Sequence, residues 1–420
     1  MNRSLKGKLA LFATLYVSLG IPHGFFREAA PVIFREQGLS QEKIGLLALF
    51  AVPWMLKLIW APFVDRFYHK GVGRRRSWIL PMQVCSVVLV IALSWWNPDT
   101  PLIYLALATL LINLFASTQD AATDGYAIEL LSPKERGWGN GIQTGGYWTG
   151  YILGGGAILV LQGILGWRTA FYIMAGIMLV AMVPVLVRPE PPVPSGSKRE
   201  PLFLTLGHMF RDFWRFLCRR HTLRIIAIVI LARMSMGFAQ TMARVMLVDL
   251  GFTLQDIGWM VGLVGPIAGL VGALAGGWMA NPLGRRRALM VAVACQLIPF
   301  AGYIVVAFSG TANQAVLTGL IALDHFVASL VMVPLFAFMM DWSAPEEGAS
   351  EYTFMDCCSI FGMIATSILA GFITKYFGYT VNFAVGLTFV AVSWLLLQFL
   401  YRPTLNPQVA GANHHHQDDS

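Results

Sequence analysis

The sequence predicts an all-α membrane protein of twelve transmembrane helices, arranged as two related six-helix bundles. Hydrophobic residues make up 56% of the 420 residues and charged residues only 12%, about half the charged share of a soluble domain. Mean hydropathy is +0.63. Long apolar stretches recur along the whole chain, and its two halves repeat the same short motifs. The bilayer is therefore the expected solvent for most of the chain.

Twelve stretches are long enough to span a membrane, which takes about 20 mostly apolar residues. We expect spans at residues 9–34, 42–64, 78–96, 101–129, 141–164, 168–187, 223–249, 256–280, 288–308, 314–340, 352–375 and 379–400. The expected domains are an N-terminal bundle (1–187), a cytoplasmic linker (188–222), a C-terminal bundle (223–402) and a cytoplasmic tail (403–420).

Lys and Arg gather in alternate connections between these spans. Arg74–Arg76, Arg285–Arg287 and the linker are basic, whereas residues 97–100 and 310–313 carry no base. This is the positive-inside pattern, which predicts that both termini face the cytoplasm. It also accounts for the net charge of +8, so we exclude nucleic acid as a partner.

Two connections have unusual compositions. The turn 341–351 has no base, and we expect its acids to face Arg285–Arg287; they are Asp341, Glu346, Glu347 and Glu351. The linker opens with proline-rich sequence and continues as a basic, aromatic stretch of amphipathic spacing. We expect that stretch to lie as a helix among the inner lipid headgroups, with a plain charged linker as the alternative.

The two halves echo each other at corresponding positions. Gly38–Gly45 resembles Gly251–Gly258, and Gly24-Phe25 resembles Gly237-Phe238. Several matches at a nearly constant offset indicate duplication. Duplicated bundles are typical of secondary transporters, whose solute binds near the midplane between the repeats.

The connection after the second span resembles the cytoplasmic turn motif of the major facilitator superfamily. The matching residues are Asp65, Arg66, Gly73, Arg74 and Arg75, and the second half keeps Gly277, Gly284, Arg285 and Arg286. Asn281 and Pro282 replace the Asp-Arg pair there. If that pair gates opening, the first half carries more of the gating.

Further motifs resemble the AmpG-type permeases within that superfamily. They are Leu56-Lys57-x-x-Trp60-Ala61-Pro62-x-x-Asp65-Arg66, Gln119-Asp120-x-x-x-Asp124-Gly125 and Glu135-Arg136-Gly137-x-Gly139. That group contains muropeptide permeases and siderophore importers of the RhtX/FptX type. Muropeptide permeases commonly have more than twelve helices. The resemblance therefore favours siderophore import across the bacterial inner membrane, with muropeptide import as the alternative and a non-transporting receptor as a third reading.

The mechanism implied is alternating access by a monomer whose partners are a small-molecule substrate and membrane lipid. We expect proton coupling, because the chain has no Gly-x-x-x-x-Gly-Lys phosphate loop. It has no His-Glu-x-x-His motif either, so we do not expect an enzyme. The five cysteines lack metal spacing, and we expect free thiols and no metal or cofactor. His414–His416 lies in the polar tail, where a disordered segment is favoured over a metal site.

Ionisable side chains within the spans are the natural site candidates, because the hydrocarbon makes them costly. His23 and Arg27 are four residues apart and share a helix face, with Glu28 about 100° away. Asp120 and Asp124 also share a face. Two close carboxylates repel, so one should hold a proton, although a nearby Lys57 or Arg27 would keep both ionised. A cation site is the third reading.

Residues of the fifth, seventh and tenth spans complete the candidates. Gln143 and Tyr147 share a face suited to a ring-bearing ligand, with ordinary packing as the alternative. Arg233, Met236, Gln240 and Arg244 form one stripe, on which we favour Gln240 and Arg244. Asp324 beside His325 could bind a proton or an arginine.

We assign three roles to these residues, from the arguments above and from the resemblance to the major facilitator superfamily. Substrate binding is assigned to His23, Arg27, Lys57, Gln143, Tyr147, Arg233, Gln240, Arg244 and His325. Proton coupling is assigned to Glu28, Asp120, Asp124 and Asp324. Gating is assigned to Asp65, Arg66, Arg74, Arg75, Glu129, Arg136, Arg285, Arg286 and Asp341.

Overall fold

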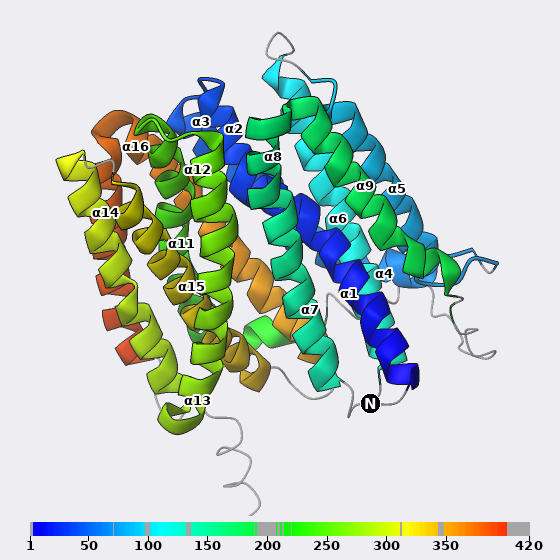
Figure 1. Ribbon diagram of the computed structural model, residues 1–420. Coiled ribbons are helices and arrows are strands. Elements are labelled where there is room, and N and C mark those ends of the chain that lie inside the picture. Colours follow the sequence, from blue (N-terminus) through cyan, green and yellow to red (C-terminus); the bar gives the residue numbers. More distant parts are fainter. Residues whose placement is uncertain are drawn as a thin grey trace, which may run out of the picture. The chain divides into compact units, whose positions relative to one another are not determined.

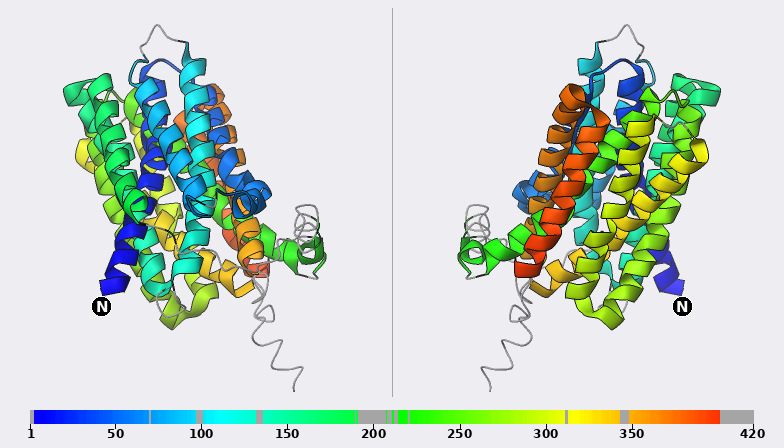
Figure 2. Two further views of the ribbon diagram at one scale, coloured as in Figure 1. Left: turned by 90° about the vertical axis from the view of Figure 1, so that its right-hand side faces the viewer. Right: turned by 90° about the vertical axis from the view of Figure 1, so that its left-hand side faces the viewer.

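Throughout the part of the chain that it describes, the computed structural model is helical, with no strand (Figure 1, Figure 2). That part comprises residues 3–69, 71–96, 101–131, 136–188, 190, 207, 211, 214–219, 221–310, 313–342 and 348–400. The tail with His414–His416 lies outside the described residues.

The helices of the first half follow the predicted spans, with three departures from α geometry. They are α1 (Arg3–Gly24), the π-helix η1 (Phe25–Ala29), α2 (Ala30–Glu36), α3 (Gln41–Leu46), the 3₁₀-helix η2 (Leu47–Ala51), α4 (Val52–Arg66), α5 (Arg76–Leu93), α6 (Leu102–Leu130), α7 (Arg136–Tyr151), the π-helix η3 (Ile152–Ala157), α8 (Ile158–Leu165) and α9 (Trp167–Val187). Pro22 lies in the last turn of α1, and the π-helix η1 begins directly after Gly24.

The second half repeats this order. It contains α11 (Thr222–Asp249), α12 (Leu254–Trp259), the π-helix η4 (Met260–Val264), α13 (Gly265–Cys295), α14 (Leu297–Ser309), α15 (Gln314–Trp342) and α16 (Gly348–Leu400). Gly284 (φ 71°) and Gly378 (φ 82°) break α13 and α16 into two helices each. Only glycine adopts this left-handed backbone without strain.

Ten helical stretches among the described residues are long and apolar enough to cross a membrane. One of them is Glu351–Leu400, which Gly378 divides into two. The broken helix from Gln41 to Arg66 supplies the remaining predicted span. Each of the twelve predicted spans therefore coincides with helix, and the all-helical membrane fold is confirmed.

The residues group into two compact units. Unit 1 comprises Met1–Ser40, Leu49–Thr205 and Leu247–Pro266, and unit 2 comprises Gln41–Ala48, Leu206–Met246 and Ile267–Ser420. The short helix α3 thus groups with unit 2, whereas α12 and η4 group with unit 1.

Glycines let the helices of unit 1 touch backbone to backbone. A Cβ placed at Gly150 of α7 would lie 2.4 Å from the Cα of Gly20 in α1, and one at Gly156 of η3 would lie 2.3 Å from the Cα of Gly262 in η4. The fifth span, made of α7, η3 and α8, thus contacts α1 and η4, and α7 lies along α1 in Figure 1.

Gly150→Ala is expected to destabilise the protein, because the added methyl group has no space between α7 and α1. Overpacking of this kind typically costs about 1–3 kcal/mol. Thermal unfolding of the purified protein in detergent measures the effect. Gly145→Ala, in the same helix, is the control, since a Cβ there meets nothing within 4 Å. An unchanged unfolding midpoint for Gly150→Ala would show that α7 can move away.

Candidate functional site

A polar cluster lies inside unit 1, on four helices. It consists of Tyr16 of α1, Lys57 of α4, Asp120 and Asp124 of α6, and Gln143 and Tyr147 of α7. The two aspartates stand one helical turn apart, as their spacing predicted. We call these six residues the unit 1 cluster.

Asp120 is the charged centre of the cluster. It is only 2% exposed, and its Oδ2 accepts a bond of 2.7 Å from Lys57 Nζ. The Tyr147 hydroxyl donates a short hydrogen bond to its Oδ1. An ionised carboxylate in such a site needs a cation and donors to offset its lost hydration. Lys57 and Tyr147 supply both, so Asp120 is arranged to hold a negative charge.

Asp124 has a different environment. The Tyr16 hydroxyl donates to its Oδ1 at 3.0 Å, and Gln143 Nε2 lies 3.4 Å from the same atom. Both donors are uncharged, so among the described residues Asp124 has no direct cation partner comparable to Lys57. Of the two carboxyl groups, Asp124 is therefore the one whose surroundings admit the protonated form.

Tyr16 was missed in the sequence, where an aromatic residue in an apolar span looks like ordinary packing. Its ring centroid lies 5.6 Å from that of Tyr147. The backbone of Gly146 leaves the space for Tyr16, since a Cβ there would lie 2.7 Å from the Tyr16 Cβ. In the sequence, the glycine pair Gly145-Gly146 before Tyr147 was the one indication that a side chain of another helix could pack there.

An aromatic cluster surrounds His23 in α1. Its ring centroid lies 4.6 Å from that of Trp54 and 5.3 Å from that of Tyr151. The Trp54 indole N–H donates to Asn113 Oδ1 at 3.0 Å, and Lys57 Nζ lies 5.8 Å from the Trp54 ring centroid. Trp54 thus connects this aromatic cluster to the unit 1 cluster.

Arg27 and Glu28 lie in the π-helix η1. The sequence geometry placed their side chains about 100° apart, yet Arg27 Nε reaches within 3.9 Å of Glu28 Oε1. Glu28 is 3% exposed, and its Cβ faces Gly155 of η3. Long flexible side chains can close an angle that backbone spacing alone sets.

In unit 2, the residues of the predicted α11 stripe contact different partners. Arg233 Nη1 donates to Asp356 Oδ1 at 3.0 Å and to Ser359 Oγ at 2.7 Å. Met236 is buried. Arg244 is 3% exposed, and one of its bonds goes to the backbone oxygen of Gln240. The stripe therefore does not face one polar partner, and sequence reasoning left Asp356 unassigned.

Asp324 and His325 of α15 are each 8% exposed. The Tyr303 hydroxyl of α14 is hydrogen-bonded to Asp324. His325 Nδ1 lies 2.9 Å from the backbone oxygen of Ile321, a contact that requires the proton on Nδ1. Tyr303 was not among the sequence candidates.

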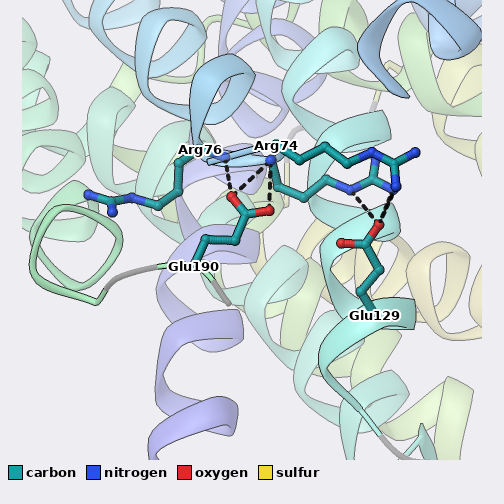
Figure 3. Close-up of polar contacts among 5 residues, drawn as sticks. Arg74, Arg76, Glu129 and Glu190 are labelled. Carbon is teal, nitrogen blue, oxygen red and sulfur yellow. Dashed lines mark hydrogen bonds and ion pairs between the residues drawn. The ribbon is translucent and has the colours of Figure 1, made fainter. Parts of the chain in front are cut away.

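Arg74 and Arg75 bind the carboxylate of Glu129 at the end of α6. Arg74 Nη1 lies 3.2 Å and Arg75 Nη2 lies 2.6 Å from Glu129 Oε1 (Figure 3). The Arg75 guanidinium is buried against Gly125, where a Cβ would lie 2.3 Å from it. The glycine of the Asp124-Gly125 motif therefore makes room for an arginine.

Glu190 completes this arrangement and was missed in the sequence. Its carboxylate accepts the backbone N–H groups of Arg75, at 2.9 and 3.0 Å, and of Arg76, at 3.1 Å (Figure 3). A carboxylate at a helix N-terminus satisfies free N–H groups and complements the helix dipole. The first residues after α9 are thus fastened to the start of α5.

One acid of the turn 341–351 has a described partner. Glu351 forms an ion pair of 2.8 Å with Arg219 of the linker. Phe216 beside it is 2% exposed and meets the Phe354 ring edge-on, which brings the linker to α16. Arg286 Nη2 lies 3.3 Å from the backbone oxygen of Gln398. Arg219 is thus one partner of Glu351. The side chains of Asp341, Glu346, Glu347 and Arg285 lie outside the described residues, so the pairing expected between this turn and Arg285–Arg287 stays a prediction.

Several predicted gating side chains lie outside the described part of the structure, namely Asp65, Arg136, Arg285 and Asp341. Arg66 is described and half-buried. Among the described residues, no group of three or more His, Cys, Asp or Glu residues could hold a metal ion.

Lys57→Met is expected to destabilise the protein, because it leaves the Asp120 carboxylate buried without its cation. Breaking a buried pair in this way costs about 3–5 kcal/mol. The double variant Lys57→Met/Asp120→Asn should recover much of the loss, since both charges are removed. Thermal unfolding in detergent measures both, with Lys43→Met at an exposed position as the control. A double variant as unstable as Lys57→Met would contradict the pairing.

The comparisons with known proteins agree on the fold. The sequence profile of the Major Facilitator Superfamily matches residues 12–323 and 228–417. The fold resembles the nucleoside transporter NupG, with a TM-score of 0.70 at 12% identity over 96% of this chain and 100% of that one. It also resembles a bacterial homologue of the human lysosomal transporter Spinster, with a TM-score of 0.64 at 15% identity over 95% and 96% of the two chains.

Relatives by sequence include named permeases. The chain is 24% identical to the anhydromuropeptide permease of Escherichia coli K12, over 94% of this chain and 80% of that protein. It is 24% identical to the putative transporter AmpG 3 of Rickettsia prowazekii, over 95% and 97% of the two chains. An uncharacterized protein of Haemophilus influenzae is 29% identical, over 94% and 95%.

Proposed function

Because the chain belongs to the Major Facilitator Superfamily, we propose that it imports an anhydromuropeptide-type solute across the bacterial inner membrane. The solute enters by alternating access, coupled to protons, and both termini face the cytoplasm. This replaces siderophore import, which the sequence analysis favoured. The named relatives support its alternative.

Chain length was our reason for preferring siderophore import, because muropeptide permeases commonly have more than twelve helices. The putative transporter AmpG 3, however, is matched over 97% of its own length. Length therefore does not separate this chain from AmpG-type transporters.

The proposal rests on the different surroundings of the two aspartates in the unit 1 cluster: Asp120 pairs with Lys57, whereas Asp124 has uncharged donors. Lys57 is a half-buried cation whose Nζ lies 2.7 Å from Asp120 Oδ2, and its side chain is 18% exposed. A solute carboxylate can take the place of Asp120 on Lys57. Muropeptides carry such carboxylates on their peptide. In this scheme Asp120 is the counter-ion of Lys57 when no solute is bound.

Asp124 is the proton carrier in this scheme. Its direct donors are the uncharged Tyr16 and Gln143, while Asp120, Lys57 and Tyr147 are the other titratable groups of the cluster. Arg75 lies along α6 on the side of Gly125 and is held there by Glu129. A proton on Asp124 removes one of two adjacent negative charges, which favours binding of an anionic solute. Proton and solute then cross together.

The helix ends supply the gate on the cytoplasmic side. Arg74, Arg75 and Glu129 join the connection before α5 to the end of α6. The Arg74 and Glu129 side chains are 29% and 37% exposed, and an ion pair at this exposure is weak enough to exchange partners during a transport cycle. We assign them to gating on that ground.

Uptake should distinguish the two solute classes directly. Cells that lack their own permeases and express this chain are expected to accumulate labelled anhydromuropeptide and not iron-loaded siderophore. The control is the same strain with an empty vector. Accumulation of the siderophore alone would overturn the proposal and restore the first reading of the sequence.

Asp124→Asn should abolish accumulation driven by a pH gradient, because the amide cannot carry a proton. It should leave exchange of labelled for unlabelled anhydromuropeptide across vesicle membranes, since exchange moves no net charge or proton. Wild-type uptake should fall as the external pH rises, and uptake by the variant should not depend on it. Asp256→Asn, at the cap of α12 and outside the unit 1 cluster, is the control. Gradient-driven accumulation by Asp124→Asn would exclude Asp124 as the carrier.

A further inference from the structure

Two helical stretches of the chain are divided between the compact units. Residues Gln41–Ala48, which include α3, group with unit 2, whereas α4 directly after them groups with unit 1. Residues Leu247–Pro266, which include α12 and η4, group with unit 1, whereas the chain from Ile267 on groups with unit 2. Each half of the sequence thus contributes one short segment to the other unit.

The helix departs from α geometry at both divisions. The 3₁₀-helix η2 (Leu47–Ala51) spans the first division, and the π-helix η4 (Met260–Val264) ends two residues before the second. Short 3₁₀ and π stretches within helices often mark hinges. The divided helices therefore have a place to bend where they pass from one unit to the other.

Backbone contacts seat the two short segments. A Cβ at Gly45 of α3 would lie 2.8 Å from the backbone oxygen of Ser367 and 3.0 Å from the Cα of Gly371 in α16. A Cβ at Gly258 of α12 would lie 3.0 Å from the backbone oxygen of Gly156. Gly45 and Gly258 correspond in the repeat, so both halves use the same contact.

An ion pair lies at each segment. Glu42 of α3 pairs with Lys375 of α16. Arg35 of α2 binds Asp249, at the end of α11, through Nε at 2.6 Å and Nη2 at 2.9 Å. All four side chains are partly exposed, between 17% and 35%. Ion pairs at this exposure are weak enough to break and reform.

The charges are not needed for packing, as the repeat itself indicates. Gln255 stands in α12 where Glu42 stands in α3, and its side chain packs against Gly163 of α8. An uncharged residue thus serves the same position in the other half. The charge on Glu42 and Lys375 requires a different explanation.

We infer that the pairs Arg35–Asp249 and Glu42–Lys375 are latches that hold the two exchanged segments. Both pairs break when the transporter opens at the end of the helices where α2 ends and α3 begins. The positive-inside pattern predicts that this end faces away from the cytoplasm. The latches then form the outer gate, opposite the Arg74–Glu129 contact.

Thiol labelling tests the Glu42–Lys375 latch without any transported solute. Ile44 is fully buried in α3, so a cysteine there reports whether the segment lifts. In the purified protein, Lys375→Glu should speed maleimide labelling of Ile44→Cys, measured by peptide-resolved mass spectrometry. The exchanged pair Glu42→Lys/Lys375→Glu should restore slow labelling. Lys43→Glu, a charge reversal at the exposed neighbouring position, should leave the rate unchanged.

Two outcomes would overturn the Glu42–Lys375 latch. One is a labelling rate that Lys375→Glu does not change. The other is fast labelling that the exchanged pair does not reverse, because that would indicate general unfolding and not loss of the pair. Neither outcome depends on which solute is carried, so the latch can fail while the proposed function holds, and the reverse.

Crosslinking tests whether the Arg35–Asp249 latch must open in each cycle. Oxidation of the variant Arg35→Cys/Asp249→Cys should abolish uptake of labelled anhydromuropeptide into vesicles, and reduction should restore it. The wild type under the same oxidant is the control. Uptake that continues while the crosslink is complete would show that this pair does not gate.

Discussion

The ion pair between Lys57 and Asp120 is the interaction on which the rest of this structure depends. Each charge alone would be costly in an apolar environment, and each is tolerable because the other lies 2.7 Å away. Tyr147 adds a hydroxyl donor to the same carboxylate. The pair fixes the relative positions of α4, α6 and α7, and it leaves Asp124 one turn away with uncharged donors. A single electrostatic constraint therefore orders the helices and separates the tasks of the two aspartates.

Glycine makes this arrangement possible at short range. Tyr16 and Tyr147 can approach the two aspartates only because α1 and α7 touch at Gly20 and Gly150. A side chain at either glycine would push the tyrosines away from α6. In a membrane, the van der Waals packing that such small residues allow is one source of the affinity between helices, beside interhelical hydrogen bonds. The glycines of α7 therefore allow the close helix contact that the polar residues of the cluster require.

The sequence predicted the fold well because its signals are local. Span length and hydropathy located the helices, and the glycine-rich turns separated them. The aspartate pair was also readable, since i and i+4 residues share a face. Tyr16, Tyr303 and Glu190 were not readable, because their roles come from contacts between distant segments. Nor could spacing choose a partner for Lys57 or for Glu351. Those choices depend on how helices lie beside one another, which no single-helix pattern contains.

The repeat explains why the backbone of the two halves agrees while their chemistry differs. Positive-φ glycines stand at matching turns, Gly38 with Gly251 and Gly166 with Gly378, because a turn that needs a left-handed residue tolerates little else. Side chains inside the bundles are under no such constraint.

Unit 1 therefore pairs Lys57 with Asp120, whereas unit 2 pairs Arg233 with Asp356 and bonds Tyr303 to Asp324. The duplicated halves thus share a backbone arrangement, whereas their charged side chains have diverged. A carrier with an acidic, lysine-bearing copy can therefore couple the proton and the anionic solute within one half, because Lys57 and Asp124 belong to the same cluster.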